Sequence, residues 1–149
     1  MQQLITRLKD YVRNNRTEVN RFLKFAVVGA IGAVVDFSIL NLGIQVFGLE
    51  KWLANVFSFT AAVISNFTWN RLWTYPESRS EPLLPQLGQF CLVNLVGLGI
   101  NEAIFLSLDH WVFASWGTWG YNISKALAIG VVLFWNFFVN RVWTYRKIK

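Results

Sequence analysis

The chain has 149 residues, of which 54% are apolar and only 15% are charged, and its net charge is +6 at neutral pH. A typical soluble domain has roughly 25% charged residues. A soluble chain of this size could not bury so much apolar surface without exposing large patches. The composition therefore excludes an ordinary soluble domain and predicts an all-α membrane protein.

The cations gather at a few points along the chain and do not follow one helix face. Such clusters are typical of the places where a membrane protein meets the cytoplasm, so nucleic-acid binding is not expected. Six cations lie near the start of the chain and four close it: Arg7, Lys9, Arg13, Arg16, Arg21 and Lys24, then Arg141, Arg146, Lys147 and Lys149.

Residues 1–21 are rich in charge, and apolar residues recur among them at helical spacing. We expect a basic amphipathic helix on the anionic cytoplasmic surface of the membrane, and a solvated tail is the alternative. The apolar stripe consists of Leu4, Ile5, Leu8, Tyr11 and Val12.

Four stretches are long and apolar enough to cross a membrane, which takes about 20 residues with a rise of 1.5 Å each. They cover 22–47, 52–73, 87–108 and 121–143. The segment 109–120 between the last two contains three Trp and is expected at the membrane interface.

The four stretches form one predicted transmembrane domain over 22–149, which follows the cytoplasmic segment 1–21. It divides into a first repeat, a hydrophilic cytoplasmic loop and a second repeat, at 22–75, 76–86 and 87–145.

An even number of spans places both termini and the loop on one side of the membrane. With Arg71 and Arg79, that side holds twelve of the fourteen Lys and Arg residues. Only Lys51 and Lys125 remain for the other side. The positive-inside rule then predicts a multi-pass protein with both termini in the cytoplasm.

One polar and aromatic phrase occurs twice. NFTWNRLWTY covers 66–75, NFFVNRVWTY covers 136–145, and seven of the ten positions are identical. Each copy ends the second helix of a predicted pair. The phrase therefore marks equivalent points of an internal repeat.

The first helices of the two pairs also correspond, in a constant register. Because each repeat contains two helices, both copies have the same orientation, which predicts two parallel-repeat helical hairpins about an axis along the membrane normal. The matched positions are Phe25/Phe90, Val28/Val93, Gly32/Gly97 and Asp36/Asn101.

The segment RFLKFAVVGAIGAVVDF (21–37), the NRLWTY and NRVWTY phrases and the repeated hairpin resemble the GtrA-like family over about residues 20–146. Members of that family are small bacterial inner-membrane proteins linked to cell-surface polysaccharide modification. The resemblance implies that a polyprenyl-phosphate-linked monosaccharide, such as undecaprenyl-phosphate glucose, is moved from the cytoplasmic to the periplasmic leaflet. It also implies a membrane glycosyltransferase as partner.

Two other functions stay open. The chain could be a non-transporting membrane subunit that anchors or regulates a polyprenyl-phosphate glycosyltransferase. It could also be a small multidrug-type exporter, although such an exporter would need a Glu in the first helix and this chain has Asp36 there. Four helices make a thin wall around a sugar phosphate, so a homodimer is expected.

Three cations are candidates for binding the substrate phosphate: Arg71, Arg141 and Lys125. A guanidinium binds phosphate bidentately, and Lys125 lies about 24 Å from Arg141 along one helix. The alternative is that the two arginines hold lipid phosphates. The neighbouring aromatics would then be interface anchors: Trp73, Tyr75, Trp143 and Tyr145.

Polar side chains within membrane helices are functional candidates, since a charge at mid-bilayer costs about 2.5–3.5 kcal/mol or more. An amide both donates and accepts, so it suits sugar hydroxyls. The alternatives are hydrogen bonds between helices and an ion pair of Glu102 with Lys125. The candidate polar path consists of Asp36, Asn66, Asn70, Asn101, Glu102, Asn136 and Asn140.

No enzyme signature is present in the sequence. His110 is the only histidine and lies beside Asp109 without a second ligand, and Cys91 is the only cysteine. We therefore predict a protein that is not an enzyme, with no catalytic residue, cofactor or metal.

Overall fold

The computed structural model describes the backbone throughout and all side chains except those of Val12, Asn14, Lys51, Trp52, Thr118, Tyr121, Asn122 and Lys125. The described backbone consists of helices and turns and contains no strand. It divides into two compact units, Met1–Pro76 and Glu77–Lys149.

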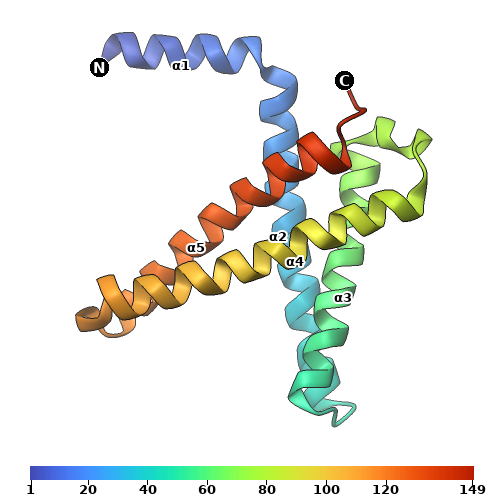
Figure 1. Cartoon of the computed structure of the whole chain (residues 1–149), viewed down its shortest axis with the longest axis vertical. Coiled ribbons are helices and arrows are strands. Elements are labelled where there is room, and N and C mark those ends of the chain that lie inside the picture. Colours follow the sequence, from blue (N-terminus) through green and yellow to red (C-terminus); the bar gives the residue numbers. More distant parts are fainter. The chain divides into compact units, whose positions relative to one another are not determined.

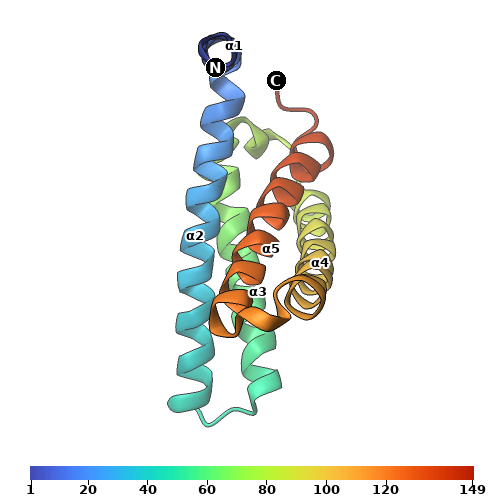
Figure 2. The same ribbon diagram turned by 90° about the vertical axis from the view of Figure 1, so that its left-hand side faces the viewer.

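The first unit is a helical hairpin preceded by a short helix. Helix α1, Gln2–Asn14, ends at Asn15, where the chain turns into α2, Arg16–Gln45. Helix α3, Lys51–Trp69, packs along α2 (Figures 1 and 2). The turn between them contains Gly48 at φ 62°, a backbone conformation that residues with a Cβ rarely adopt.

The second unit is also a helical hairpin. Helix α4, Leu83–Ser107, continues through a π-helical turn, Leu108–Val112, and α5, Thr118–Val139, returns along it (Figures 1 and 2). Gly117, at φ 57°, allows the sharp change of direction before α5. The predicted 109–120 connection is therefore largely helical, and the part without helix is short.

Three of the described helices are long and apolar enough to cross a membrane: Arg16–Gln45, Leu83–Val112 and Ala126–Thr144. The expected all-α membrane protein is confirmed at this level. Helix α3 covers the second predicted stretch, but it is not among these three spans. The four-span count and the parallel repeat in the membrane stay predictions.

Both returning helices end in the same unusual way. After α3 and α5 the backbone widens into π-helical turns, Asn70–Thr74 and Asn140–Thr144. The Tyr75 N–H donates to the Asn70 carbonyl at 2.7 Å, and the Tyr145 N–H donates to the Asn140 carbonyl at 2.8 Å. Single π-helical turns of this kind are frequent at functional sites.

Equivalent positions of the two units are buried alike. The coincidence covers both helices of each hairpin, as a duplicated packing pattern requires. The buried pairs include Phe25/Phe90, Val28/Val93, Gly32/Gly97, Phe67/Phe137, Asn70/Asn140 and Tyr75/Tyr145.

The two tyrosines of the repeated phrase are not interface anchors, contrary to that expectation. Tyr75 is 0% exposed and Tyr145 is 1% exposed, whereas Trp73 and Trp143 are partly exposed. The π-helical turn explains the difference, because its hydrogen bond places each Tyr directly above a buried Asn five residues earlier. In an α-helix the same Tyr would point well away from that Asn.

Helix α1 has the form predicted for an interfacial helix. Leu4, Ile5, Leu8 and Tyr11 are all exposed on it, and Arg13 lies in its last turn. A basic helix with such an uncovered apolar stripe is typical of segments that lie in the membrane surface.

We expect a nitroxide at position 8 to lie in lipid and one at position 10 to lie in water, because α-helical residues two positions apart face nearly opposite sides. The variants are Leu8→Cys and Asp10→Cys in a Cys91→Ser background. The measurement is electron paramagnetic relaxation in bilayers by oxygen and by a water-soluble nickel complex. Equal access of the nickel complex to both labels would contradict an interfacial helix.

Candidate functional site

Each copy of the repeated phrase forms a row of polar side chains along one buried helix face. In the first unit this polar ladder consists of Asn66, Asn70 and Thr74, which are spaced four residues apart. Asn70 is 1% exposed, Thr74 is buried and Asn66 is half-buried. Three polar groups therefore line up where an apolar face would be expected.

The second polar ladder consists of Asn136, Asn140 and Thr144. The Asn140 Nδ2 donates to the Asn136 carbonyl at 2.8 Å, and the Thr144 hydroxyl donates to the Asn140 Oδ1 at 2.7 Å. Asn140 is completely buried. These hydrogen bonds give partners to the Asn140 amide and to the Thr144 hydroxyl.

The first ladder lacks the corresponding bond. Among the described side chains, no hydrogen-bond partner reaches the buried Asn70 Oδ1 or the buried Thr74 hydroxyl. A buried polar atom without a partner costs about 1–3 kcal/mol. The two ladders therefore share a sequence but differ in how far their groups are satisfied.

A glycine of the neighbouring helix makes room for the first amide of each ladder. A Cβ on Gly32 of α2 would collide with the Asn66 amide, and a Cβ on Gly97 of α4 would lie 2.6 Å from the Asn136 Oδ1. The Trp135 Nε1 also donates to the Val93 carbonyl at 3.2 Å, which joins α5 to α4. Glycine allows two helices to approach this closely.

The side-chain amides of Asn66 and Asn136 keep unused hydrogen-bonding capacity. Within the part of the chain whose side chains are described, the Oδ1 atoms of Asn66 and Asn136 are buried and have no hydrogen-bond partner. The Asp36 Oδ1 is in the same state. Asp36 lies four residues after Gly32, and Asn101 lies four residues after Gly97, each on the same helix face as its glycine.

Arg71 and Arg141, the cations of the two phrases, are half-buried. We call the end of each hairpin at which its phrase lies the charged end. The charged end of the first unit includes Arg21, Lys24 and Arg71, and that of the second unit includes Arg141 and Arg146. The Arg141 Nη1 donates to the Tyr145 carbonyl at 3.1 Å. This bond anchors the end of the π-helical turn.

The remaining predicted site residues are not brought into either ladder. Asn101 is half-buried and Glu102 is exposed on α4. The side chain of Lys125 lies outside the described residues, so its pairing with Glu102 is untested. Among the described side chains, no group of three or more His, Cys, Asp or Glu residues could hold a metal ion.

Two buried polar residues at the charged ends, Arg21 and Gln86, are not among the site residues predicted from the sequence. Arg21 is 5% exposed, donates to the Glu18 Oε1 at 2.8 Å and lies 5.3 Å from the Tyr75 ring centre. Gln86 is 4% exposed. The register that pairs Phe25 with Phe90 also aligns these two, so extending the repeat towards the start of each first helix would have found them.

Comparison with known proteins gives a family match over most of the chain. Residues 24–145 match the family described as GtrA/DPMS, transmembrane domain. The uncharacterized membrane protein YngA of Bacillus subtilis is 27% identical over 122 residues, which is 82% of this chain and 77% of that protein.

A dolichol-phosphate mannosyltransferase of Pyrococcus furiosus is 28% identical over 88 residues, or 59% of this chain. The matched segment is only 25% of that protein. The chain therefore spans about a quarter of this relative and most of the other.

We expect Gly32→Ala to destabilise the first hairpin by about 1–3 kcal/mol, because the added methyl collides with the Asn66 amide. Gly29→Ala on the same helix is the matched control, since its Cβ would meet open space. The measurement is reversible unfolding in mixed micelles. Adding Asn66→Ala should recover much of the loss in Gly32→Ala. Equal costs at Gly29 and Gly32 would contradict the close contact between Gly32 and the Asn66 amide.

We expect Thr144→Val to cost about 1 kcal/mol of unfolding free energy, because the substitution removes the hydrogen bond to Asn140. Thr74→Val removes a hydroxyl that has no such partner among the described residues, so it should be neutral or stabilising. The same unfolding experiment compares the two variants. A larger loss in Thr74→Val would refute the difference between the ladders.

Proposed function

Because the chain belongs to the GtrA/DPMS transmembrane domain family, we propose that it moves a polyprenyl-phosphate-linked monosaccharide across the membrane. The direction is from the cytoplasmic to the periplasmic leaflet of a bacterial inner membrane, and the product serves modification of cell-surface polysaccharide. Both termini lie in the cytoplasm in this proposal, which rests on the twelve-to-two distribution of cations.

The observation that carries the proposal is the unsatisfied amide oxygen at the head of each polar ladder. Membrane helices have no water to satisfy such atoms, so an orphaned polar atom there is costly. Asn66 and Asn136 each keep one buried oxygen free of partners among the described side chains. A sugar hydroxyl can donate to such an oxygen and recover the lost bond.

The relatives support the class of substrate. One similar protein is named a dolichol-phosphate mannosyltransferase, and a polyprenyl phosphate has the same combination of long apolar chain and phosphate as dolichol phosphate. The apolar chain stays in the lipid, so the protein needs a polar path for the sugar and the phosphate only.

In this proposal Arg71 and Arg141 bind the phosphate at the charged ends, and Lys125 receives it on the other side. A planar guanidinium donates two parallel hydrogen bonds to a phosphate. Asp36, Asn70, Asn101 and Asn140 complete the polar path together with the two orphaned amides.

The exposure of Glu102 supports a second protein surface beside α4. A charged side chain of a membrane helix almost always faces protein or a water-filled cavity, and Glu102 is exposed on α4 of the second unit. A homodimer or a membrane glycosyltransferase would cover it. We keep both as proposed partners.

A second candidate function has a specific observation in its favour. The Pyrococcus mannosyltransferase contains a segment similar to this chain within a single, much longer protein. A separate chain of this family could therefore serve as the membrane subunit that anchors or regulates a polyprenyl-phosphate glycosyltransferase. No such observation supports a multidrug-type exporter.

The decisive experiment is transfer in liposomes that contain the purified protein and a polyprenyl-phosphate sugar. We expect Arg71→Ala and Arg141→Ala to slow transfer about tenfold or more, because a hydrogen bond to a charged group contributes about 1.5–3 kcal/mol. The rate is measured as sugar that becomes accessible on the second leaflet.

Arg79→Ala is the matched control, because it removes an arginine outside both phrases. Wild-type transfer no faster than in protein-free vesicles, with or without a proton gradient, would overturn the transport proposal. Unchanged transfer in both phrase variants would remove the arginines from it.

A further inference from the structure

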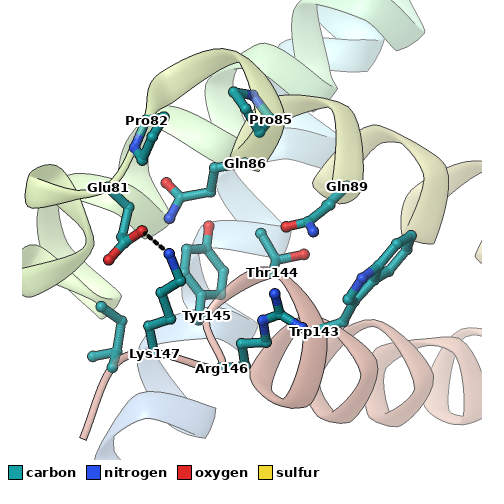
Figure 3. A pocket seen from close by; sticks show the side chains of 11 residues that line it. Glu81, Pro82, Pro85, Gln86, Gln89, Trp143, Thr144, Tyr145, Arg146 and Lys147 are labelled. Carbon is teal, nitrogen blue, oxygen red and sulfur yellow. Dashed lines mark hydrogen bonds and ion pairs between the residues drawn. The ribbon is translucent and has the colours of Figure 1, made fainter.

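A cavity opens at the charged end of the second unit, where the start of α4 meets the end of the chain. Its volume is about 160 Å³. Gln86 and Gln89 of α4 face Thr144 and Arg146 across it, and Glu81 and Lys147 stand at one side (Figure 3). All of these residues belong to one unit.

The lining has the chemistry that recognises a sugar. The two Gln amides can donate and accept, and the Thr144 oxygen can accept while its proton is given to Asn140. Trp143 adds an aromatic surface to the lining, against which the C–H face of a pyranose can pack. Gln86 is almost fully buried and lines the cavity, so its amide is shielded from bulk water.

The size of the cavity limits the ligand to one ring. A cavity of about 150 Å³ admits a benzene-sized molecule, and this one has about 160 Å³. A hexose is larger than benzene, so the cavity admits at most part of one hexose ring and excludes a chain of sugars.

The cations beside the cavity suit a phosphate attached to that ring. Arg146 and Lys147 are both exposed there, and the Lys147 Nζ pairs with the Glu81 Oε2 at 2.8 Å. The Glu81 carboxylate neutralises Lys147, which leaves the Arg146 guanidinium as the lining cation that can bind a phosphodiester.

The first unit has two cations at the equivalent positions. In the register of the repeat, Gln86 corresponds to Arg21 and Gln89 corresponds to Lys24. The Arg21 guanidinium is buried over the Tyr75 ring. The Lys24 Nζ donates to the Trp73 carbonyl at 3.3 Å and lies 5.5 Å from the Trp73 ring centre.

We propose that the cavity at the charged end of the second unit binds the hexosyl-phosphate head of the lipid-linked sugar, and that the first unit, which has cations in place of the two Gln amides, does not bind it. This inference rests on the proposed function for the identity of the ligand. Gln86 and Gln89 bind the hydroxyls, Trp143 packs against the ring, and Arg146 joins Arg141, at the same charged end, in binding the phosphate.

The test is equilibrium binding by the full chain in nanodiscs. The probes are radiolabelled short-chain prenyl phosphates that carry glucose, galactose, mannose or N-acetylglucosamine, with bare prenyl phosphate and glucose 1-phosphate as separate arms. Gln89→Lys copies the first unit and should weaken binding of the preferred sugar form about tenfold or more through loss of an amide and filling of the cavity. Binding of bare prenyl phosphate should change much less.

Two matched controls separate the cavity from general effects of charge. Gln3→Lys makes the same change on α1, and Lys24→Gln makes the reverse change at the equivalent place of the first unit; both should bind like the wild type. Gln89→Leu keeps the volume without a charge and should also weaken sugar binding. Arg146→Ala should weaken the sugar form and bare prenyl phosphate alike.

The outcomes separate the cavity from the transport proposal. If the wild type binds no sugar form more tightly than bare prenyl phosphate, or if folded Gln89→Lys and Gln89→Leu both bind normally, the cavity proposal is overturned. That result leaves wild-type transfer in liposomes, and hence the proposed function, standing. Binding that depends on Gln89 without any transfer would support the cavity and overturn transport.

Discussion

The close contact between a glycine of one helix and an asparagine of the next sets the structure of both hairpins. Gly32 and Gly97 have no side chain to separate the helices, so the amides of Asn66 and Asn136 fit against their backbones. In a membrane the helices gain little from the hydrophobic effect, and close packing together with polar contacts must hold them. The same contact buries an amide oxygen in each hairpin and leaves it unsatisfied by the described residues.

The rest of each polar ladder follows from this contact between glycine and asparagine. Because Asn66 and Asn136 are fixed against the neighbouring helix, Asn70 and Asn140 one turn later also face inward. The widened turn then places Tyr75 and Tyr145 above those residues, where both are buried. A polar face packed in this way is costly unless its groups find partners. Among the described side chains, Thr144 pairs with Asn140, whereas the Asn70 Oδ1 and the Thr74 hydroxyl have no partner. That difference is why a duplicated sequence need not give two equivalent sites.

The sequence predicted the helices well and the partners of the polar side chains poorly. Long apolar stretches, the repeated phrase and the stripe of α1 are local patterns, and the structure has a helix at each. The burial of Tyr75 could not be predicted, since it depends on one backbone hydrogen bond that changes the helix type. The burial of Arg21 depends on contacts with Glu18 and with the Tyr75 ring, which lies far away along the chain. Arginine near a membrane boundary otherwise predicts a surface residue.

The charged ends of the two repeats differ in chemistry although both repeats are helical hairpins. The same apolar residue occupies both positions of the pairs Phe25/Phe90 and Val28/Val93. Arg21 and Gln86 occupy equivalent buried places, yet one carries a charge that must be paired and the other carries an amide that can be shared with a ligand. A buried Arg satisfied by a carboxylate and a ring has little left to offer a substrate. In the proposed mechanism, each chain therefore holds one sugar head, in its second unit, and the first unit contributes its unsatisfied ladder to the path.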